Sequence, residues 1–374
     1  MKKILLFLFL VLLSVASAYS QTVNELITQS RTQLELKKPV NANAKAEAAL
    51  KLAPNNPDAN VLVAITRLLT FVDTPACSAL MTRLGFGPNG RNIYNWTNAP
   101  GKHLNGDLFV PANFSAAELA AFIKTNLVPA LRASEANLAK ITDKNFVFTF
   151  TPAETTSDFL TFDYGDFQLC RAGLNAFQFA CRTIASWNLD VQLEAIRAYG
   201  DHPGTTLDQI LAENSKLLTF ANVSDLLSAK TDFLAAINLY SEASTFIRAR
   251  KTGVTRVFNL DSVDLGEESE FRSTLLQVKS SLTAPVVLST ATNVTLDLSK
   301  FFSPTVAPRD LLPSVHSVTP ALPDPTFGGV VTFGKGITSV TIPKGTTSLG
   351  SSAYFGYTSW ACFEKTDSKI ESFG

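Results

Sequence analysis

Three histidines, at positions 103, 202 and 316, are the side chains best suited to proton transfer or metal binding near neutral pH. His202 stands in the triplet Asp201-His202-Pro203, in an expected loop between two helices. A metal or acid–base site there needs further acids, and Asp163, Asp166 and Asp190 are the candidates nearest along the chain. The sequence favours the simpler interpretation, a solvated loop whose polar residues cap the following helix.

Other sequence patterns that carry chemistry are missing. The chain has no His-Glu-X-X-His, no cysteine pair at metal spacing and no Gly-X-Ser-X-Gly. The acidic residues Asp261, Asp264, Glu267 and Glu268 lack the regular spacing of a calcium loop, because Gly266 is out of frame. A solvated helix start is expected there instead. We therefore assign no catalytic, cofactor-binding or metal-binding residue, and no cofactor, from the sequence.

Two further patterns have both a ligand-binding and a plain structural interpretation. The stretch Gly85-Phe86-Gly87-Pro88-Asn89-Gly90 opens an irregular region that extends to residue 114, but Gly90-Arg91-Asn92 does not supply the Lys-Ser/Thr pair of a phosphate-binding loop. A surface loop is therefore expected rather than an anion site. A group of aromatic residues could line a sugar-binding face, although a core role is favoured: Phe159, Phe162, Tyr164 and Phe167.

The N-terminus predicts export. Lys2 and Lys3 precede an apolar run from Ile4 to Leu13, and Ala16-Ser17-Ala18 offers the small residues of a signal-peptidase site before Tyr19. The apolar run is shorter than the roughly 20 residues that cross a bilayer. We expect residues 1–18 to be removed and the mature chain to act in the periplasm or outside the cell. The compact signal and low cysteine content favour a bacterial source.

Composition limits the classes of partner. The chain has 374 residues, of which 46% are hydrophobic and 17% charged, as in a globular protein with ample material for a core. Lys+Arg and Asp+Glu both number 32, and signal removal takes away two lysines, which leaves a net charge of −2. This balance attracts no polyanion, so nucleic acid is not expected as a partner. No membrane span is expected after the signal.

The four cysteines, at positions 77, 170, 181 and 362, leave two alternatives open. Cys170 and Cys181 are expected in one helix, too far apart to form a disulfide with each other. A bridge would therefore join Cys77 or Cys362 to one of them. Buried free thiols are an equally acceptable interpretation.

Hydrophobic periodicity predicts a mainly helical body. Helices are expected over 41–52, from Pro57 onward, from Ser115 to a kink at Pro129, and over 167–187, 223–251 and 267–282. Alternation over 145–151 predicts a short strand or an extended link. Residues 283–327 are rich in Pro, Thr, Val and Ser, which is typical of extended chain with short strands and proline turns.

The helical segment 23–71 resembles a tetratricopeptide repeat, the helix–turn–helix unit of about 34 residues. Ala42, Ala49 and Pro54 occupy the small, small and proline positions of that pattern, whereas Ala46 and Asn60 replace its usual aromatic residues. The resemblance covers about one and a half units. It implies helical hairpins that stack on a further element, because one unit does not bury its own apolar face.

A second resemblance lies near the C-terminus. Ile337-Thr338-Ser339-Val340-Thr341-Ile342-Pro343, Thr347-Ser348-Leu349-Gly350 and Ser351-Ser352-Ala353-Tyr354-Phe355-Gly356-Tyr357-Thr358-Ser359-Trp360 resemble one BspA-type leucine-rich repeat. Tyr357 and Trp360 depart from the Cys and Leu of that family. The family occurs in surface and secreted proteins, where its repeats bind proteins or surfaces. The resemblance therefore implies binding rather than catalysis.

Together these patterns predict a signal peptide (1–18), tetratricopeptide-like hairpins (19–84), a helical domain continuous with them (85–282), an extended proline-rich segment (283–327) and a leucine-rich-repeat-like end (328–374). The expected function is that of a secreted, non-catalytic scaffold that engages an unknown protein or cell-surface partner. The alternative is an exported enzyme or small-ligand binder with a site in the helical body.

Overall fold

Helix is the dominant regular structure. A computed structural model of the chain describes residues 21–101, 111, 113–156, 158–191, 207–251, 254–261, 264–288, 295–305, 307–311, 314–317 and 329–332. Helices make up 63% of the described residues and the sheets are small, which confirms the mainly α class. The signal peptide, His103, Asp201-His202-Pro203 and the leucine-rich-repeat-like motif lie outside the described residues.

The described residues fall into two compact units. Unit 1 draws on the segments Met1–Phe109, Lys124–Cys181 and Thr231–Leu276. Unit 2 draws on Val110–Ile123, Arg182–Lys230 and Gln277–Gly374. Each unit is assembled from three separate stretches of the sequence.

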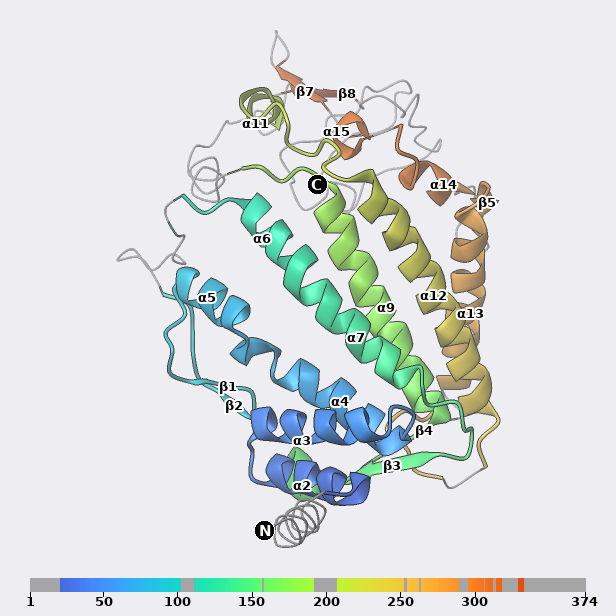
Figure 1. Cartoon of the computed structure of the whole chain (residues 1–374). Helices are drawn as coiled ribbons and strands as arrows, with labels where there is room; N and C mark the ends of the chain where they lie inside the picture. The colour runs from blue at the N-terminus through green and yellow to red at the C-terminus, as the bar shows by residue number, and fades with distance from the viewer. Residues whose placement is uncertain are drawn as a thin grey trace, which may run out of the picture. The chain divides into compact units, whose positions relative to one another are not determined.

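Unit 1 begins with stacked helical hairpins: α2 (Val23–Glu35), α3 (Pro39–Leu52) and α4 (Pro57–Leu69) (Figure 1). α3 packs on both α2 and α4. Its alanines at positions 42, 46 and 49 are fully buried, because side chains of this size let neighbouring helices approach closely. The helices predicted over 41–52 and from Pro57 are thus confirmed.

Local signals explain where these helices begin and end. Thr22 and Glu25 form a reciprocal capping box at the start of α2. The Asn56 side chain caps α4, with Pro57 as the first helical residue. Lys37 ends α2 with a positive φ of 57°, and its N–H and that of Lys38 donate to Leu34 and Gln33 carbonyls. This is a Schellman-type end with lysine in the position that glycine usually takes.

A short antiparallel ribbon, β3 (Val147–Phe150) with β4 (Leu160–Asp163), packs against these hairpins. Phe148 pairs with Phe162 across the ribbon, and Thr149 pairs with Thr161. Between the strands, α8 (Pro152–Thr155) forms a single helical turn. The strand expected over 145–151 is confirmed, whereas β4 was not predicted.

The core of unit 1 is an aromatic cluster beside small aliphatic residues. Phe146 and Phe162 both stack on Phe167, with centroid separations of 5.9 and 5.7 Å. Phe148 and Phe150 meet edge to face at 4.8 Å. Such pairs add about 0.5–1.5 kcal/mol beyond their burial. Phe162, Phe167 and the buried Tyr164 are therefore structural, as favoured, but Phe159 is 67% exposed.

Longer helices supply most of the rest of unit 1: α7 (Val128–Leu138), α9 (Tyr164–Ser186), α12 (Val223–Arg248) and α13 (Asp264–Ser281). The last residues of α9 and α13 and the first residues of α12 belong to unit 2. α9 lies between α7 and α12 (Figure 1), and the contacts agree. Arg171 Nε donates to Glu135 Oε1 at 2.8 Å. Phe179 stacks on Phe233 at 4.6 Å. The helices predicted over 167–187, 223–251 and 267–282 are confirmed to within three residues at each end.

At the expected kink or break near Pro129, the structure has a π-helical segment instead. α6 (Ala116–Phe122) begins after Ser115, as predicted, with a capping box formed by Ser115 and Glu118, and it continues through the π-helical residues Ile123–Leu127 into α7. Pro129 is the second residue of α7. A proline ring clashes with the carbonyl four residues earlier, so the backbone widens upstream of the proline.

Unit 2 contains shorter elements. The described part of 283–327 holds two-residue strands β5 (Val286–Val287) and β6 (Thr295–Leu296), as predicted, and two short helices that were not predicted, α14 (Leu298–Phe301) and α15 (Pro308–Leu311). Arg309 donates its guanidinium N–H groups to the carbonyls of Leu211, Asn214 and Leu217. It thereby caps the C-terminal end of α11 (Leu207–Glu213). A further ribbon pairs β7 (Ser314–Ser317) with β8 (Gly329–Thr332).

Candidate functional site

The predicted acids Asp163 and Asp166 lie together at the start of α9. Asp163 Oδ1 accepts hydrogen bonds from the N–H groups of Gly165 and Asp166, at 3.0 and 3.4 Å. Asp166 Oδ2 accepts the Asp163 N–H at 2.8 Å. The two side chains form a reciprocal cap, because the first N–H groups of a helix have no partner within the helix. The first role of both carboxylates is therefore to begin α9.

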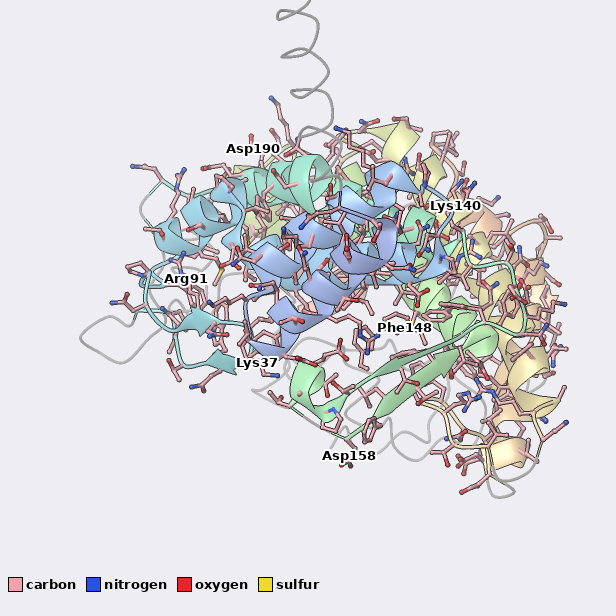
Figure 2. The ribbon with its side chains drawn as sticks, turned by 60° about the horizontal axis from the view of Figure 1, so that its bottom comes forward. Lys37, Arg91, Lys140, Phe148, Asp158 and Asp190 are labelled. Atoms are coloured by element: carbon pink, nitrogen blue, oxygen red, sulfur yellow. The ribbon has the colours of Figure 1, made fainter. Side chains whose placement is uncertain are left out.

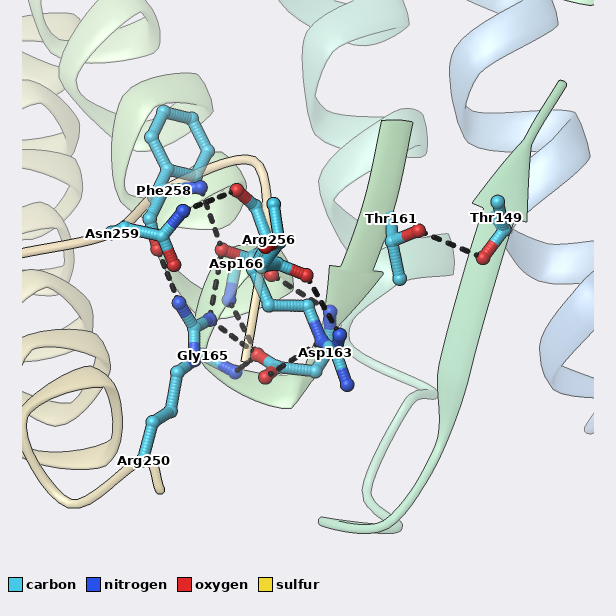
Figure 3. A network of polar contacts seen from close by, with 10 residues as sticks. Thr149, Thr161, Asp163, Gly165, Asp166, Arg250, Arg256, Phe258 and Asn259 are labelled. Carbon is cyan, nitrogen blue, oxygen red and sulfur yellow. Dashed lines mark hydrogen bonds and ion pairs between the residues drawn. The ribbon is translucent and has the colours of Figure 1, made fainter. Parts of the chain in front are cut away.

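Two arginines from beyond the end of α12 complete this cluster, which we call the Asp163 cluster: Asp163, Asp166, Arg250 and Arg256 (Figure 3). One Arg250 terminal nitrogen lies 2.5 Å from Asp163 Oδ1 and 2.8 Å from Asp166 Oδ1. Arg256 Nε lies 3.4 Å from Asp163 Oδ2. The Phe258 N–H also donates to Asp166 Oδ1, at 3.1 Å. All four carboxylate oxygens are thus engaged.

The Asp163 cluster is a buried group of paired charges that connects two parts of the chain. The Asp166 side chain is 0% exposed, and those of Asp163 and Arg250 are each 8% exposed. Two negative and two positive charges are paired there. The pKa of Asp166 is raised, mainly because the side chain is buried and also because Asp163 beside it is negatively charged. The hydrogen bond from the Asp163 N–H and the charge of Arg250 lower this pKa, but they do not outweigh the burial. Asp166 therefore connects α9 to the chain that follows α12, and neither of its oxygens is available to a substrate.

The other members of the predicted acid–base site are not brought to this cluster by the described residues. Asp190 is exposed and belongs to unit 2, where its N–H donates to the Asn188 side chain. His202 lies outside the described residues. The structure therefore joins Asp163 to Asp166 and joins both to arginines that the sequence did not single out.

The glycine-rich region is organised around one side chain. Arg91 lies in β1 (Arg91–Asn92), which pairs with β2 (Asn95–Trp96) in a small hairpin. Its guanidinium donates to five acceptors: Gly87 O, Ser78 O, Ser78 Oγ, Thr82 Oγ1 and Phe86 O. An arginine has five N–H donors, so none remains for a phosphate. The preference for a loop without an anion site agrees with this arrangement.

A second buried polar group, the Glu154 cluster, surrounds α8: Arg31, Lys37, Tyr94, Thr151 and Glu154. Arg31 donates to Glu154 Oε2 and to the Thr149 carbonyl, both at 2.7 Å. The Thr151 N–H also donates to Glu154 Oε2, at 2.7 Å. Lys37 donates to the Ala153 carbonyl at 2.6 Å (Figure 2). These contacts tie the end of α2 to the strand–helix junction of the β3–β4 ribbon.

Both clusters keep buried polar atoms without a hydrogen bond in the described chain: these are the nitrogens Arg250 Nε and Arg256 Nε in the Asp163 cluster, and oxygens in the Glu154 cluster. Three of its oxygens are shielded from solvent and have no hydrogen-bond partner in the described chain: Tyr94 Oη, Thr151 Oγ1 and Glu154 Oε1. The Glu154 side chain is 0% exposed. Burial raises the pKa of the Tyr94 phenol, and the negative charge of Glu154 raises it further.

The acidic stretch before α13 agrees only in part with the expectation of a solvated helix start. The Asp261 side chain accepts the Asp264 N–H at 3.1 Å and caps the helix. Glu268, by contrast, is buried and forms an ion pair with Arg248 of α12. Glu268 lies in the helix, as predicted, but it is buried and connects two helices instead of facing solvent.

The cysteines provide no nucleophile in the described chain. Cys77, Cys170 and Cys181 are free thiols, and Cys362 lies outside the described residues. Burial raises the pKa of all three, that of Cys170 to about 11, so each is protonated at neutral pH. The alternative of buried free thiols therefore describes these three residues.

The described residues contain no group of three or more His, Cys, Asp or Glu positioned to hold a metal ion. No helix within the described ranges has the length and apolar content needed to cross a bilayer. Comparisons with protein-family models, with curated proteins and with solved structures returned no match. The geometry of the two clusters is therefore the basis for inferring function.

Sequence reasoning missed the residues that complete both clusters. Arg250 and Arg256 lie after the end of α12, and neither was singled out from the sequence as part of a site. Glu154 had a recognisable signal, because Thr151-Pro152-Ala153-Glu154 matches the Thr-X-X-Glu capping pattern with proline at the first helical position. Tyr94 had no such signal, since its position depends on the loop built around Arg91.

Proposed function

We propose that the mature chain is an exported, non-catalytic helical scaffold that binds a protein or cell-surface partner. The observation that carries this proposal is the state of Asp163 and Asp166. These are the acids best placed in the sequence for catalysis, and all four of their oxygens are engaged by main-chain N–H groups and arginines. A catalytic acid needs an oxygen within hydrogen-bonding distance of the substrate. The partners of Asp163 and Asp166 occupy all of their oxygens.

The helical hairpins of unit 1 supply the second support. α2, α3 and α4 pack through fully buried alanines, an arrangement similar to the tetratricopeptide repeats that serve as protein-binding scaffolds. Their outer surface keeps apolar side chains in water, since Leu36, Val40 and Leu52 are each more than half exposed. Exposed apolar groups on a rigid helical stack suit the binding of a protein surface.

Export is tested directly by expressing the full chain with a C-terminal tag in a bacterial host and measuring the intact mass of the periplasmic product. We expect a mass that corresponds to a start at Tyr19. Recovery of the full-length mass from the cytoplasm would contradict export.

Partner binding is tested by placing a photo-crosslinking amino acid at Val40, and separately at Glu270 on α13, in the native host. We expect one discrete adduct from position 40 and none from position 270, which is also exposed. Identical adduct patterns at the two positions, or none at either, would count against a partner on the hairpins.

A further inference from the structure

The exposed side of α9 is apolar, which is the reverse of an ordinary surface helix. The exposed residues of this helix lie three and four positions apart along one side, and all of them are apolar: Gly173, Ala176, Phe177, Ala180 and Ile184. We call this side the α9 face. Its two large side chains are well exposed, Phe177 by 50% and Ile184 by 42%. The α9 face therefore has the composition of an interface.

The opposite side of α9 carries polar residues, and the protein covers it. Gln168, Asn175 and Gln178 are at most 7% exposed. Arg171, which lies between them on the same side of the helix, donates to Glu135 of α7 at 2.8 Å. At 3.6 residues per turn, this polar side and the α9 face point in opposite directions. Turning the helix to hide its apolar residues would break these polar contacts, so the α9 face leaves water only when a partner covers it.

The sizes of the side chains make the α9 face complementary to itself. A two-fold axis that crosses α9 between residues 178 and 179 makes two copies antiparallel and brings Phe177 of one copy level with Ala180 of the other. The same axis brings Ile184 level with Gly173, where an added Cβ would meet nothing within 4 Å among the described residues. A large side chain therefore lies beside a small one at each level, as the packing of ridges into grooves requires. A surface that fits its own copy in this way is the requirement for a two-fold interface.

Charge and area also favour a second copy of this chain as the occupant. No residue of the α9 face is charged, so the two-fold axis brings no like charges together, and a partner that is recognised through ion pairs is disfavoured. The exposed half of Phe177 amounts to about 100 Å². Five residues of which three are glycine or alanine therefore cover less than the roughly 800 Å² per partner of a stable interface. A reversible dimer is expected rather than a permanent one.

We propose that the mature chain associates through the α9 face into an antiparallel, two-fold dimer that is in equilibrium with the monomer. Packing Phe177 beside Ala180 of the second copy removes apolar surface from water, which supplies the driving force. The dimer goes beyond the scaffold function proposed above and does not depend on it. Two copies carry two sets of helical hairpins, so a surface that repeats a binding site would be held more tightly than by one copy.

Sedimentation velocity of the chain from Tyr19 onward, between low micromolar and millimolar concentration, tests the proposal. We expect the mass to rise from that of a monomer toward that of a dimer as the concentration increases. Phe177→Glu places a negative charge on the face of both copies and should weaken association by about tenfold or more. Leu227→Glu is the matched control, because it adds the same charge at a residue of α12 that is 49% exposed. It should leave association unchanged.

An exchange of large and small residues separates specific packing from general apolar adhesion. Ala180→Phe adds apolar surface but puts two large side chains at one level, so we expect association to weaken by about tenfold. Phe177→Ala combined with Ala180→Phe exchanges the two positions and should restore most of the association. Thermal unfolding shows whether each variant is folded.

Three results would overturn the proposal. The first is a monomer at every concentration of the natural chain, which decides the question even where a variant does not fold. The second is a tighter dimer in Ala180→Phe, which would indicate unspecific apolar adhesion. The third is an equal loss of association in Phe177→Glu and Leu227→Glu. The adduct at position 40 reports on the scaffold function separately.

Discussion

The Asp163 and Glu154 clusters place similar residues in similar burial, but they are bonded to different degrees. In the Asp163 cluster, two carboxylates meet two arginines and four main-chain N–H groups, and every carboxylate oxygen is engaged. In the Glu154 cluster, one carboxylate meets one arginine through a single oxygen, and the other oxygen has no partner among the described residues.

The difference concerns how the carboxylate oxygens of the two clusters are used. A buried ion pair whose lone pairs are all occupied fixes the geometry of the elements it joins, even where it adds little net stability. A buried carboxylate with a spare oxygen costs free energy in the isolated protein, which a suitable ligand can recover on binding. Whether each carboxylate oxygen has a hydrogen-bond partner is therefore a better guide to a binding site than the presence of acidic residues.

The largest expected effect is at Arg250. Arg250→Met leaves Asp163 and Asp166 facing each other with only Arg256 nearby, so we expect a loss of about 3–5 kcal/mol in the free energy of unfolding, the usual cost of breaking a buried ion pair. Urea denaturation measures it. Lys251→Met changes the exposed neighbouring residue and should stay within about 0.5 kcal/mol. Equal losses in the two variants would show that the Asp163 cluster does not hold unit 1 together.

A smaller effect is expected at Arg31. Arg31→Met removes the cation from Glu154, and because Arg31 is partly exposed the loss should be about 2 kcal/mol rather than the full cost of a buried pair. The double variant Arg31→Met with Glu154→Leu removes the stranded carboxylate as well. We expect it to be more stable than Arg31→Met alone in the same denaturation assay. A double variant less stable than either single one would mean that the carboxylate is stabilised by something other than Arg31.

Two glycines of α9 test how tightly the Asp163 cluster is packed. A Cβ at Gly165 would lie 2.7 Å from the Phe246 ring and 3.0 Å from the Ile247 side chain, so Gly165→Ala should cost about 1–3 kcal/mol through overpacking. A Cβ at Gly173 meets nothing within 4 Å among the described residues, so Gly173→Ala should gain about 0.5–1 kcal/mol from helix propensity. Calorimetry measures both. A gain at both positions would mean that α9 and α12 are less closely packed there.

A similarly small effect concerns the backbone that carries Glu154. Thr156 ends α8 at a φ of 75°, which is unfavourable for a β-branched residue. Thr156→Gly should raise the free energy of unfolding by about 1 kcal/mol, because glycine adopts this conformation without a steric penalty. Thr156→Ala keeps the Cβ and should give no such gain. Chemical denaturation decides between them, and a similar gain from alanine would place the cause in the threonine side chain instead.

Local sequence signals predicted most of the helical framework. The alanines of α3, the capping residues Ser115 and Glu118, and the long apolar faces of α9 and α12 all act within a few residues of themselves. Such patterns report on secondary structure because the spacing of side chains fixes which face is buried. The strand β4 was missed because its aromatic residues were interpreted as core or as a sugar-binding face, without a strand being assigned to them.

The candidate sites could be predicted only in part, because their partners come from distant segments. Arg250 lies 87 residues from Asp163, and Arg31 lies 123 residues from Glu154. The hydrophobic periodicity of a sequence does not predict which arginine will pair with which acidic residue. Asp163 and Asp166 were named only as candidate partners of His202, and their position before an expected helix was the available sign that they would act as a cap. The unpartnered oxygens became visible only with the fold.

The hydrogen bonds of Arg91 to its loop have a consequence for how the sequence of this region can evolve. Three of its five acceptors are main-chain carbonyls, which every amino acid supplies. Side chains that take no part in these contacts can therefore vary while the loop keeps its shape. Lysine, with three donors and no planar fork, is a poor replacement for Arg91. Selection on the shape of this region is thus expected at a few positions, which are Arg91 and the two glycines with positive φ, Gly85 and Gly90.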